Sequence, residues 1–288
     1  MQMAFHIAPG AERTWTPVAD VPGLRQCVLL GAAHGSVHMQ VELLQLDPGA
    51  EVPAHLHPYE NSWYVLDGGG HREVGGLRYE VAEADYGLTP VGLAHRIAAG
   101  PRGMRWLSVS APRPPAYSDA VHNIPAELAP GVELGRPSET DPRHQWAGHF
   151  TEADIAPYAR LSMPGYHGEN IKNIAVHMLV DELLGAVHHT MFMVEFAAGI
   201  GAGEAAGEHY HPFEEAYFLL SGSAHGTLDG KEVTVSAGDL VWTGTDATHG
   251  FINLNHEPVR WIEVQSPVPP RSNAFFFPAD WSKLAAEG

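Results

Sequence analysis

The residues best suited to chemistry are His209 and His211, followed by Glu215 and, further along the chain, His249. Side chains two positions apart on a β-strand share one face, so His209 and His211 can direct both imidazoles at one point while Tyr210 faces away. Glu215 opens the next strand-like run and His249 belongs to a later one. Three neutral nitrogens and one anionic oxygen therefore predict a divalent metal site.

The ligand types limit which metal this site would hold. Imidazole and carboxylate without thiolate suit Fe(II), Mn(II), Ni(II), Co(II) or Zn(II), and argue against a cysteine-based structural zinc. Four protein ligands leave positions open on a six-coordinate ion, so we expect a catalytic metal. Such an ion can polarise a carbonyl, deprotonate a bound water, or bring a substrate and dioxygen together. The alternative is a polar cluster without an ion.

Further side chains share the face of these ligands, because alternate strand residues point to the same side. We predict that four of them line a substrate pocket: Tyr217, Leu219, Phe251 and Asn253. For Tyr217 we favour packing in the barrel core over direct contact with substrate, because aromatic residues contribute large buried areas.

The sequence around the first two histidines occurs twice. HLHPYENSWYVLDG at 55–68 matches HYHPFEEAYFLLSG at 209–222, and His95 follows His57 at the same spacing as His249 follows His211. Because a repeat of this length marks a repeated structural unit, each half of the chain carries one complete unit.

Periodicity predicts the fold of each unit. Short runs with period-two alternation are bounded by Gly, Pro and Asp, which is typical of antiparallel strands. The 288 residues, with 31 Gly and 23 Pro, suit two turn-rich domains. We predict an all-β protein with an N-terminal barrel at 1–115, a linker at 116–182 and a C-terminal barrel at 183–288. Short helices are expected at 151–161 and 278–288.

The N-terminal unit lacks one predicted ligand. His55, His57 and His95 occupy the matching positions, but Asn61 stands where the carboxylate is expected, with Glu60 beside it. A neutral amide leaves more of a dication's charge uncompensated in a low-dielectric interior, so affinity should fall. A second metal at the three histidines is left open.

Two adjacent histidines, His188 and His189, lie side by side on one predicted strand. Only one of them can face inward, where it could transfer protons near a metal. We favour the reading as ordinary surface histidines.

Charge and hydropathy limit the partners. The formal net charge is −18, from 16 basic and 34 acidic residues, which would repel a nucleic-acid backbone. The sequence has no apolar run of about 18 residues and its first residues do not resemble a secretion signal, so we expect no membrane partner and a cytoplasmic protein. The expected partner is a small-molecule substrate. A homodimer through exposed sheet edges is left open.

These residues resemble the two motifs of the cupin superfamily, G-x5-H-x-H-x3,4-E-x6-G and P-x-G-x-x-H-x3-N. The C-terminal half retains both, apart from Gly244 and Asp246 in place of the usual Pro and Gly; its matching residues are His209, His211, Glu215, Gly222, His249 and Asn253. The N-terminal half matches at Gly49, His55, His57, Gly68, Pro90, Gly92 and His95. The chain is thus similar to a bicupin, which implies two tandem jelly-roll β-barrels with a few short helices.

The resemblance implies three functions. We favour a metal-dependent enzyme, an Fe(II)-type dioxygenase, acting on a small polar organic substrate at the C-terminal metal. Triple-histidine iron sites also occur in gentisate-type cupin dioxygenases, which keeps the N-terminal site open. The first alternative is a Mn(II)-dependent hydrolase or isomerase similar to ureidoglycine aminohydrolases, although their motif begins Glu-x-His and ends in a Gln ligand. The second is a non-enzymatic binding protein, but storage cupins usually lose their histidines.

Overall fold

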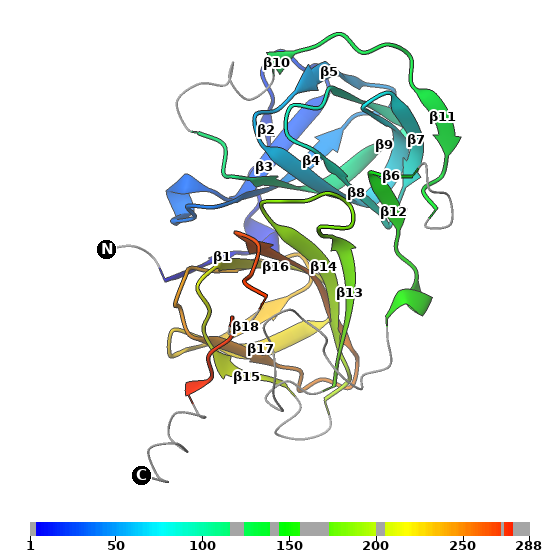
Figure 1. Cartoon of the computed structure of the whole chain (residues 1–288). Coiled ribbons are helices and arrows are strands. Elements are labelled where there is room, and N and C mark those ends of the chain that lie inside the picture. Colours follow the sequence, from blue (N-terminus) through cyan, green and yellow to red (C-terminus); the bar gives the residue numbers. More distant parts are fainter. Residues whose placement is uncertain are drawn as a thin grey trace. The chain divides into compact units, whose positions relative to one another are not determined.

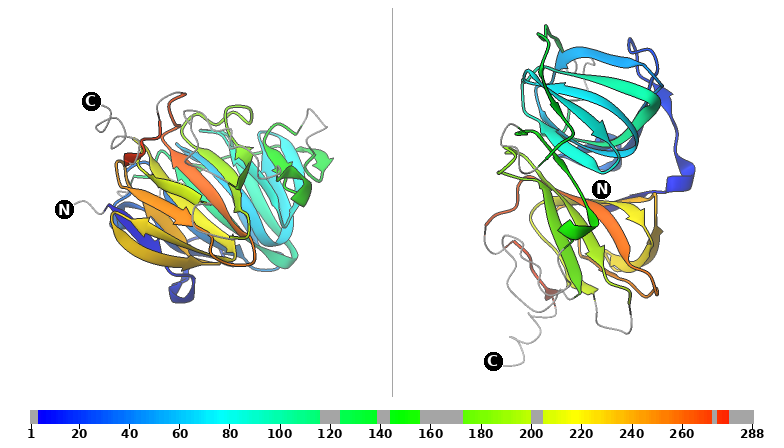
Figure 2. Two further views of the ribbon diagram at one scale, coloured as in Figure 1. Left: turned by 90° about the horizontal axis from the view of Figure 1, so that it is seen from below. Right: turned by 90° about the vertical axis from the view of Figure 1, so that its right-hand side faces the viewer.

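The computed structural model describes residues 4–115, 124–138, 144–155, 173–199, 205–271 and 274–278 (Figure 1). The chain forms two compact units. The N-terminal unit contains residues 13–151 and 179–190, and the C-terminal unit contains residues 1–12, 152–178 and 191–288. In Figure 2 the strands of each unit wrap around an interior. The fold is therefore all-β, with one barrel for each sequence repeat.

Helical structure is scarce in the described residues. The helices with described bounds are short 3-10 segments: η1 (Gly10–Glu12), η2 (Ala32–His34) and η4 (Glu152–Asp154). The last coincides with the start of the helix expected at 151–161. Residues 156–161 and 279–288, where the other helical turns were expected, lie outside the described residues. No described helix has the length and apolarity needed to cross a membrane.

The N-terminal unit is built on two long strands, β6 (Glu60–Val74) and β9 (His95–Ala111), which pair antiparallel along most of their length. The main sheet has the order β11-β7-β6-β9-β4-β3-β2, and β5 and β8 branch from it by pairing with β9 and β6. The remaining strands are β2 (Thr16–Pro17), β3 (Leu24–Leu30), β4 (Gln40–Leu46), β5 (Glu51–Leu56), β7 (Leu77–Ala82), β8 (Asp85–Thr89), β10 (Ile124–Pro125), β11 (Val132–Gly135) and β12 (Ala147–His149).

Glycines let β6 turn from one face of the barrel to the other. The β6–β9 register shifts between Gly68 and Gly70, and Gly68 has a φ of 74°. A Cβ at Gly68 would lie 2.2 Å from the Gly103 carbonyl oxygen, and one at Gly70 would lie 2.0 Å from that of Ala98. Backbone approaches this close require glycine, so the bend is encoded locally.

The C-terminal unit contains two separate sheets. The first has the order β1-β19-β16-β21-β14-β13 and the second the order β15-β20-β17-β18. Gly222, with a φ of 74°, joins β16 to β17 at the position that matches Gly68. The strands are β13 (Ile174–Val180), β14 (Thr190–Phe196), β15 (Ala205–His209), β16 (Glu214–Ser221), β17 (Ser223–Leu228), β18 (Lys231–Ser236), β19 (Leu240–Thr243), β20 (His249–Ile252) and β21 (Val259–Ser266).

The first residues of the chain belong to the C-terminal unit, whereas the sequence pattern placed them at the start of the N-terminal barrel. β1 (Phe5–Ala8) pairs antiparallel with β19, with His6 opposite Trp242. The Gly10 backbone N–H also donates to the Asp239 carboxylate over 2.8 Å. The sequence of a four-residue strand does not indicate which strand it pairs with. The pairing with β19 is known only from the structure.

Each barrel encloses its own apolar core. In the N-terminal unit Trp63 and Trp106 are almost completely buried among aliphatic side chains from the surrounding strands. In the C-terminal unit the aromatic part of the core consists of Phe192, Phe196, Tyr217, Phe251 and Trp261. Burying these large rings supplies much of the driving force for folding, because apolar burial contributes roughly 25 cal/mol per Å².

A buried carboxylate fastens residues 179–190 to the N-terminal barrel. The Glu60 oxygens accept hydrogen bonds from the backbone N–H groups of Val187, His188 and His189 over 3.0, 2.8 and 3.1 Å, and His189 Nδ1 lies 2.7 Å from Oε1. His189 Nε2 lies 2.6 Å from Ser62 Oγ. The chain of contacts from Ser62 through His189 to Glu60 resembles a Ser-His-Glu triad. Because Ser62 and His189 are both 0% exposed, the cluster is structural.

This cluster corrects the surface reading of His189, and it explains Glu60. The carboxylate beside Asn61 points to the backbone of residues 187–189 and is not a ligand substitute. Burial alone would raise the pKa of Glu60, but the hydrogen bond and charge of His189 and the backbone N–H groups lower it below 4.5.

Glu60→Gln should lower the free energy of unfolding by about 2 kcal/mol at pH 7, because charge-assisted hydrogen bonds are lost. A carboxylate whose pKa is lower in the folded state stabilises the fold above its unfolded pKa, and this stabilisation disappears as the pH falls through the folded pKa. The difference between the two proteins should therefore shrink below pH 4.5. Urea unfolding at a series of pH values measures it, with the half-exposed Glu51→Gln as control. A difference that is constant with pH contradicts this role of Glu60.

Candidate metal centre

The four predicted ligands meet in the C-terminal barrel. His209 ends β15, Glu215 is the second residue of β16, and His249 begins β20 directly opposite His209. His211 follows β15. The candidate ligand atoms of these four residues lie within 4.8 Å of one another, and all four side chains are buried.

Strand alternation predicted that the two histidines of the first motif share one strand. In the structure they do not. β15 ends at His209, and Tyr210 forms an isolated bridge with Phe276 through hydrogen bonds of 3.0 and 2.9 Å. The bridge still turns Tyr210 away from His211, which stacks on Phe213 with ring centroids 3.9 Å apart. The bridge therefore maintains the alternation beyond the end of the strand.

Backbone carbonyls orient all three imidazoles in the same way. The Nδ1 atoms of His209, His211 and His249 lie 2.7, 2.8 and 2.9 Å from the carbonyl oxygens of Gly207, Phe213 and Ala247. A carbonyl oxygen only accepts, so each Nδ1 carries a hydrogen and donates it. The neutral tautomer then leaves the lone pair on Nε2, which is the arrangement of a metal-binding histidine.

The inward atoms form a donor set that fits a divalent cation. The Nε2 atoms of His211 and His249 lie 2.8 and 3.2 Å from Glu215 Oε2. Burial and the neighbouring histidines lower the pKa of His209 to about 3, which keeps it neutral. Lone pairs and a carboxylate held this close repel one another unless a positive species lies between them. A divalent ion bound by the three Nε2 atoms and the Glu215 carboxylate satisfies all four.

Glu215 is further held by two neighbours. Gln265 Nε2 donates to Glu215 Oε1 over 2.5 Å, and the Tyr217 hydroxyl donates to Oε2. Burial alone would raise the pKa of Glu215, but the neighbouring His211 and the hydrogen bonds to the carboxylate lower it well below its usual value. Glu215 is therefore ionised, as a ligand must be.

Glu263 supplies a second carboxyl group beside Glu215. Burial and the negative charge of Glu215 raise the pKa of Glu263 well above its usual value, so it is protonated. Trp261 Nε1 donates to Glu263 Oε2 over 2.9 Å, which fixes the orientation of the group. One carboxyl ionised and its neighbour protonated is an arrangement suited to proton transfer.

A cavity of about 40 Å³ opens onto this cluster. At roughly 10–15 Å³ for each water it holds about three waters, so the space suits a small ligand. Its lining combines polar and aromatic groups: His209, Glu215, Tyr217, His249, Glu263, Phe196, Phe251, Trp261 and Phe275, with Ile174, Val176, Val194 and Ala206.

Two of the four predicted pocket residues line this cavity, and two do not. Tyr217 and Phe251 are on its wall. Leu219 is 2% exposed and packs in the core. Asn253 donates from Nδ2 to the carbonyls of Ala197 and Glu257, both over 2.9 Å, and so stabilises a loop. Strand alternation predicts the inward face but not how deep along the barrel a residue lies.

Sequence reasoning missed Glu263 and Gln265, which lie on β21 opposite Tyr217 and Glu215. A signal existed in the repeat. The matching strand of the N-terminal half has Ser108 and Ser110 at these positions, so the acidic and amide side chains are lost together with the liganding carboxylate.

The N-terminal barrel also brings its three histidines together. The candidate ligand atoms of His55, His57 and His95 lie within 4.8 Å of one another. His55 and His95 orient Nδ1 towards backbone carbonyls over 2.7 and 3.1 Å. The Asn61 amide donates to Ser108 Oγ over 2.8 Å and adds no charge to the group. The geometry of a triple-histidine site is present without an anionic ligand.

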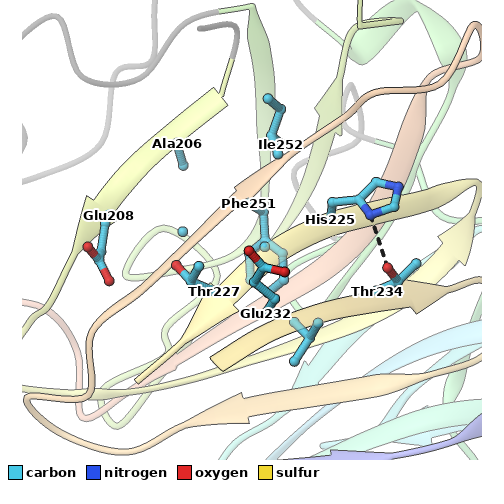
Figure 3. A pocket seen from close by; sticks show the side chains of 11 residues that line it. Ala206, Glu208, His225, Thr227, Glu232, Thr234, Phe251 and Ile252 are labelled. Carbon is cyan, nitrogen blue, oxygen red and sulfur yellow. Dashed lines mark hydrogen bonds between the residues drawn. The ribbon is translucent and has the colours of Figure 1, made fainter. Parts of the chain in front are cut away.

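A second hollow in the C-terminal unit is an open groove, lined from β15, β17, β18 and β20 (Figure 3). Its acidic side chains, Glu208 and Glu232, are exposed, and Thr234 Oγ1 and His225 Nδ1 form a hydrogen bond of 3.0 Å. In the described part of the chain the ligand clusters lie elsewhere, at the two histidine groups. The groove is larger than the interior cavity, but it lacks a comparable set of converging groups.

The chain belongs to the cupin superfamily and is a bicupin. The family model described as "Cupin domain" matches it twice, at residues 42–110 and 198–265. Each match covers one repeat, including the histidines of that barrel.

The relatives found by sequence and those found by structure differ in the share of this chain that they match. The tetracenomycin polyketide synthase protein TcmJ of Streptomyces glaucescens is 29% identical over 128 residues, which is 44% of this chain and 82% of TcmJ. The oxalate decarboxylase of Bacillus subtilis matches 98% of this chain and 82% of its own, with a TM-score of 0.63 and 17% identity. The formate complex of Lactobacillus farciminis oxalate decarboxylase matches 98% and 92%, with a TM-score of 0.65 and 15% identity. The structural likeness supports the two-barrel fold.

His211→Ala should remove the divalent metal from the C-terminal barrel, because the remaining ligands leave one coordination position to water. The matched His57→Ala should change the total metal content little. Elemental analysis of the purified full-length proteins measures both. Equal loss of metal from the two variants would contradict the ranking of the two sites.

Proposed function

We propose that this chain is a metal-dependent enzyme that binds a small polar organic substrate to a divalent ion in its C-terminal barrel. The observation that carries the proposal is the convergence of three carbonyl-oriented imidazoles with an ionised carboxylate at a cavity. A structural metal site would surround its ion with protein ligands, whereas four ligands at a cavity leave positions for a substrate. When bound, the ion supplies a Lewis acid to which substrate oxygen atoms coordinate.

The residues around the cavity define what the protein can do for such a substrate. Phe196, Phe251 and Trp261 form an apolar wall that excludes water and strengthens electrostatic interactions inside the site. Tyr217 and Gln265 hold Glu215 in one orientation. Glu263, protonated and on the cavity wall, can donate a proton to a bound substrate.

The finer proposal is oxidative: an Fe(II)-type dioxygenase that cleaves its substrate with dioxygen. It is supported by the ligand types, which suit Fe(II), and by positions left for both substrate and dioxygen. Substrate and dioxygen would then meet beside the apolar wall of the cavity. Compounds with adjacent oxygen atoms, such as catechols and diketones, can chelate such an ion through both oxygens and are the substrates to test first.

The second candidate is a non-oxidative, Mn(II)-dependent enzyme, either a hydrolase or an isomerase. The specific observation in its favour is Glu263, because hydrolysis and isomerisation require a proton donor near the metal, and this carboxyl group is held in its protonated form. Mn(II) is further supported by the Mn(II) centres of the Bacillus subtilis oxalate decarboxylase.

The two candidates differ in oxygen consumption. The full-length protein should be loaded anaerobically with Fe(II) or Mn(II) and supplied with catechols, diketones, hydroxybenzoates, ureido compounds and oxalate. We expect the Fe(II) protein to consume oxygen. Turnover without oxygen consumption, such as ammonia release, identifies the non-oxidative enzyme. An absence of turnover with every metal and compound class counts against an enzyme of either kind.

Glu263→Gln separates the two candidates by rate. If Glu263 donates the proton, this isosteric change should lower kcat by about 10²-fold while the metal content is retained. Tyr217→Phe is the control, because it removes a hydrogen bond at Glu215 but leaves the acid. Equal effects of the two variants would show that Glu263 acts only through the ligand Glu215.

A further inference from the structure

An arginine lies inside the N-terminal barrel. Arg72, on β6, is 2% exposed and is among the largest fully buried side chains. It pairs with Ile97 of β9, a residue of the barrel core. Ile97 lies two residues after His95 on the same strand, so both face the interior, and the guanidinium shares that interior with the histidine cluster. A charged group buried this deeply normally has a counter-ion.

Two donors of this guanidinium lack partners. Arg72 Nε and Nη2 have no hydrogen-bond acceptor among the described residues. These two nitrogens carry the parallel N–H groups on one side of the guanidinium plane, the pair that binds both oxygens of one carboxylate. A buried donor without an acceptor destabilises the fold, so this arrangement is unfavourable unless a ligand accepts from both N–H groups.

The neighbouring carboxylates do not neutralise Arg72. Glu73 follows it in the chain and points to the other face of the strand, where Arg96 lies 2.7 Å and Arg78 3.6 Å from it. Glu42 is an inward carboxyl group of β4, and burial raises its pKa to about 7. Burial lowers the pKa of Arg72 to about 9, with no counteracting charge from a carboxylate of the described chain.

Two tryptophans hold Arg72 without satisfying its donors. The Arg72 Cζ atom lies 4.3 Å from the centroid of Trp63 and 5.1 Å from that of Trp106. Cation–π attraction offsets part of the charge. It does not supply a hydrogen-bond acceptor, so Nε and Nη2 stay unpaired.

The C-terminal barrel has a different pair at the same place. Gly226 follows Gly222 at the spacing by which Arg72 follows Gly68, and it pairs with Phe251 as Arg72 pairs with Ile97. A Cβ at Gly226 would lie 2.6 Å from the Phe251 ring. An aromatic ring therefore occupies this part of the metal-site barrel, and a cation occupies it in the other. The two interiors are built for different ligands.

We propose that the N-terminal barrel is a second ligand site that binds a small carboxylate anion side-on to Arg72 Nε and Nη2. Trp63 and Trp106 flank the guanidinium that receives the two oxygens. The anion neutralises the guanidinium in an interior whose histidine cluster lacks the carboxylate found in the other barrel. This inference does not depend on the reaction of the C-terminal site.

The test uses the full-length His211→Ala protein, so that a C-terminal metal does not contribute to carboxylate binding. Acetate, formate and oxalate are titrated separately and followed by tryptophan fluorescence, since Trp63 and Trp106 flank the guanidinium. Arg72→Met should lower the affinity for the carboxylate that binds by at least tenfold. Arg78→Met, which removes a partly exposed arginine of the neighbouring strand, should change the affinity less than twofold.

Arg72→Lys is the second variant, because it retains the charge but cannot present two parallel donors. Arg72→Lys should also lower the affinity by at least tenfold. If thermal unfolding shows that Arg72→Met does not fold, Arg72→Lys alone tests whether Arg72 binds the carboxylate. Saturable binding of inorganic phosphate in place of every carboxylate would overturn the assigned ligand class. Absence of binding, or unchanged affinity in both Arg72 variants, would overturn the site.

Discussion

The structure depends on one electrostatic constraint: three imidazole lone pairs and a carboxylate face one another inside the C-terminal barrel. Each lone pair is directed inward because the opposite ring nitrogen donates to a backbone carbonyl. Glu215 is kept ionised by groups that donate to it, among them Tyr217 and Gln265. A divalent cation at the centre of this set relieves the repulsion that the fold otherwise imposes. The bends and pairings of the barrel bring the strands together at this point.

The two barrels show how one fold supports two kinds of interior. The backbone bend at Gly222 has its counterpart at Gly68, and the histidines occupy matching positions of the sequence repeat. The remaining inward positions differ. The C-terminal barrel has acidic and amide groups around its histidines, whereas the N-terminal barrel has Asn61 and two serines, and Arg72 at its core. The same fold thus surrounds a candidate cation site in one barrel and an interior with unbalanced positive charge in the other. The function of each barrel follows from its side chains, not from the fold.

The sequence predicted the all-β architecture, the duplicated unit and the four converging ligands, because strand alternation and fixed spacing are local properties. It predicted less about depth and distant partners. Leu219 and Asn253 lie on the expected strands but do not reach the cavity. Glu263 resembles any strand residue until its register opposite Tyr217 is known. His189 read as a surface residue because its partner, Glu60, is distant in the sequence. Long-range pairing decides such roles, and the pattern of a single strand does not encode it.

The most direct measurement is anomalous diffraction from crystals of the full-length protein loaded with Fe(II) or Mn(II), recorded at the absorption edge of the metal. The account predicts a strong peak in the C-terminal barrel, about 2.1 Å from each of three histidine Nε2 atoms and from a Glu215 oxygen. A C-terminal barrel with no peak at these atoms, in a protein that has taken up the metal, would contradict it.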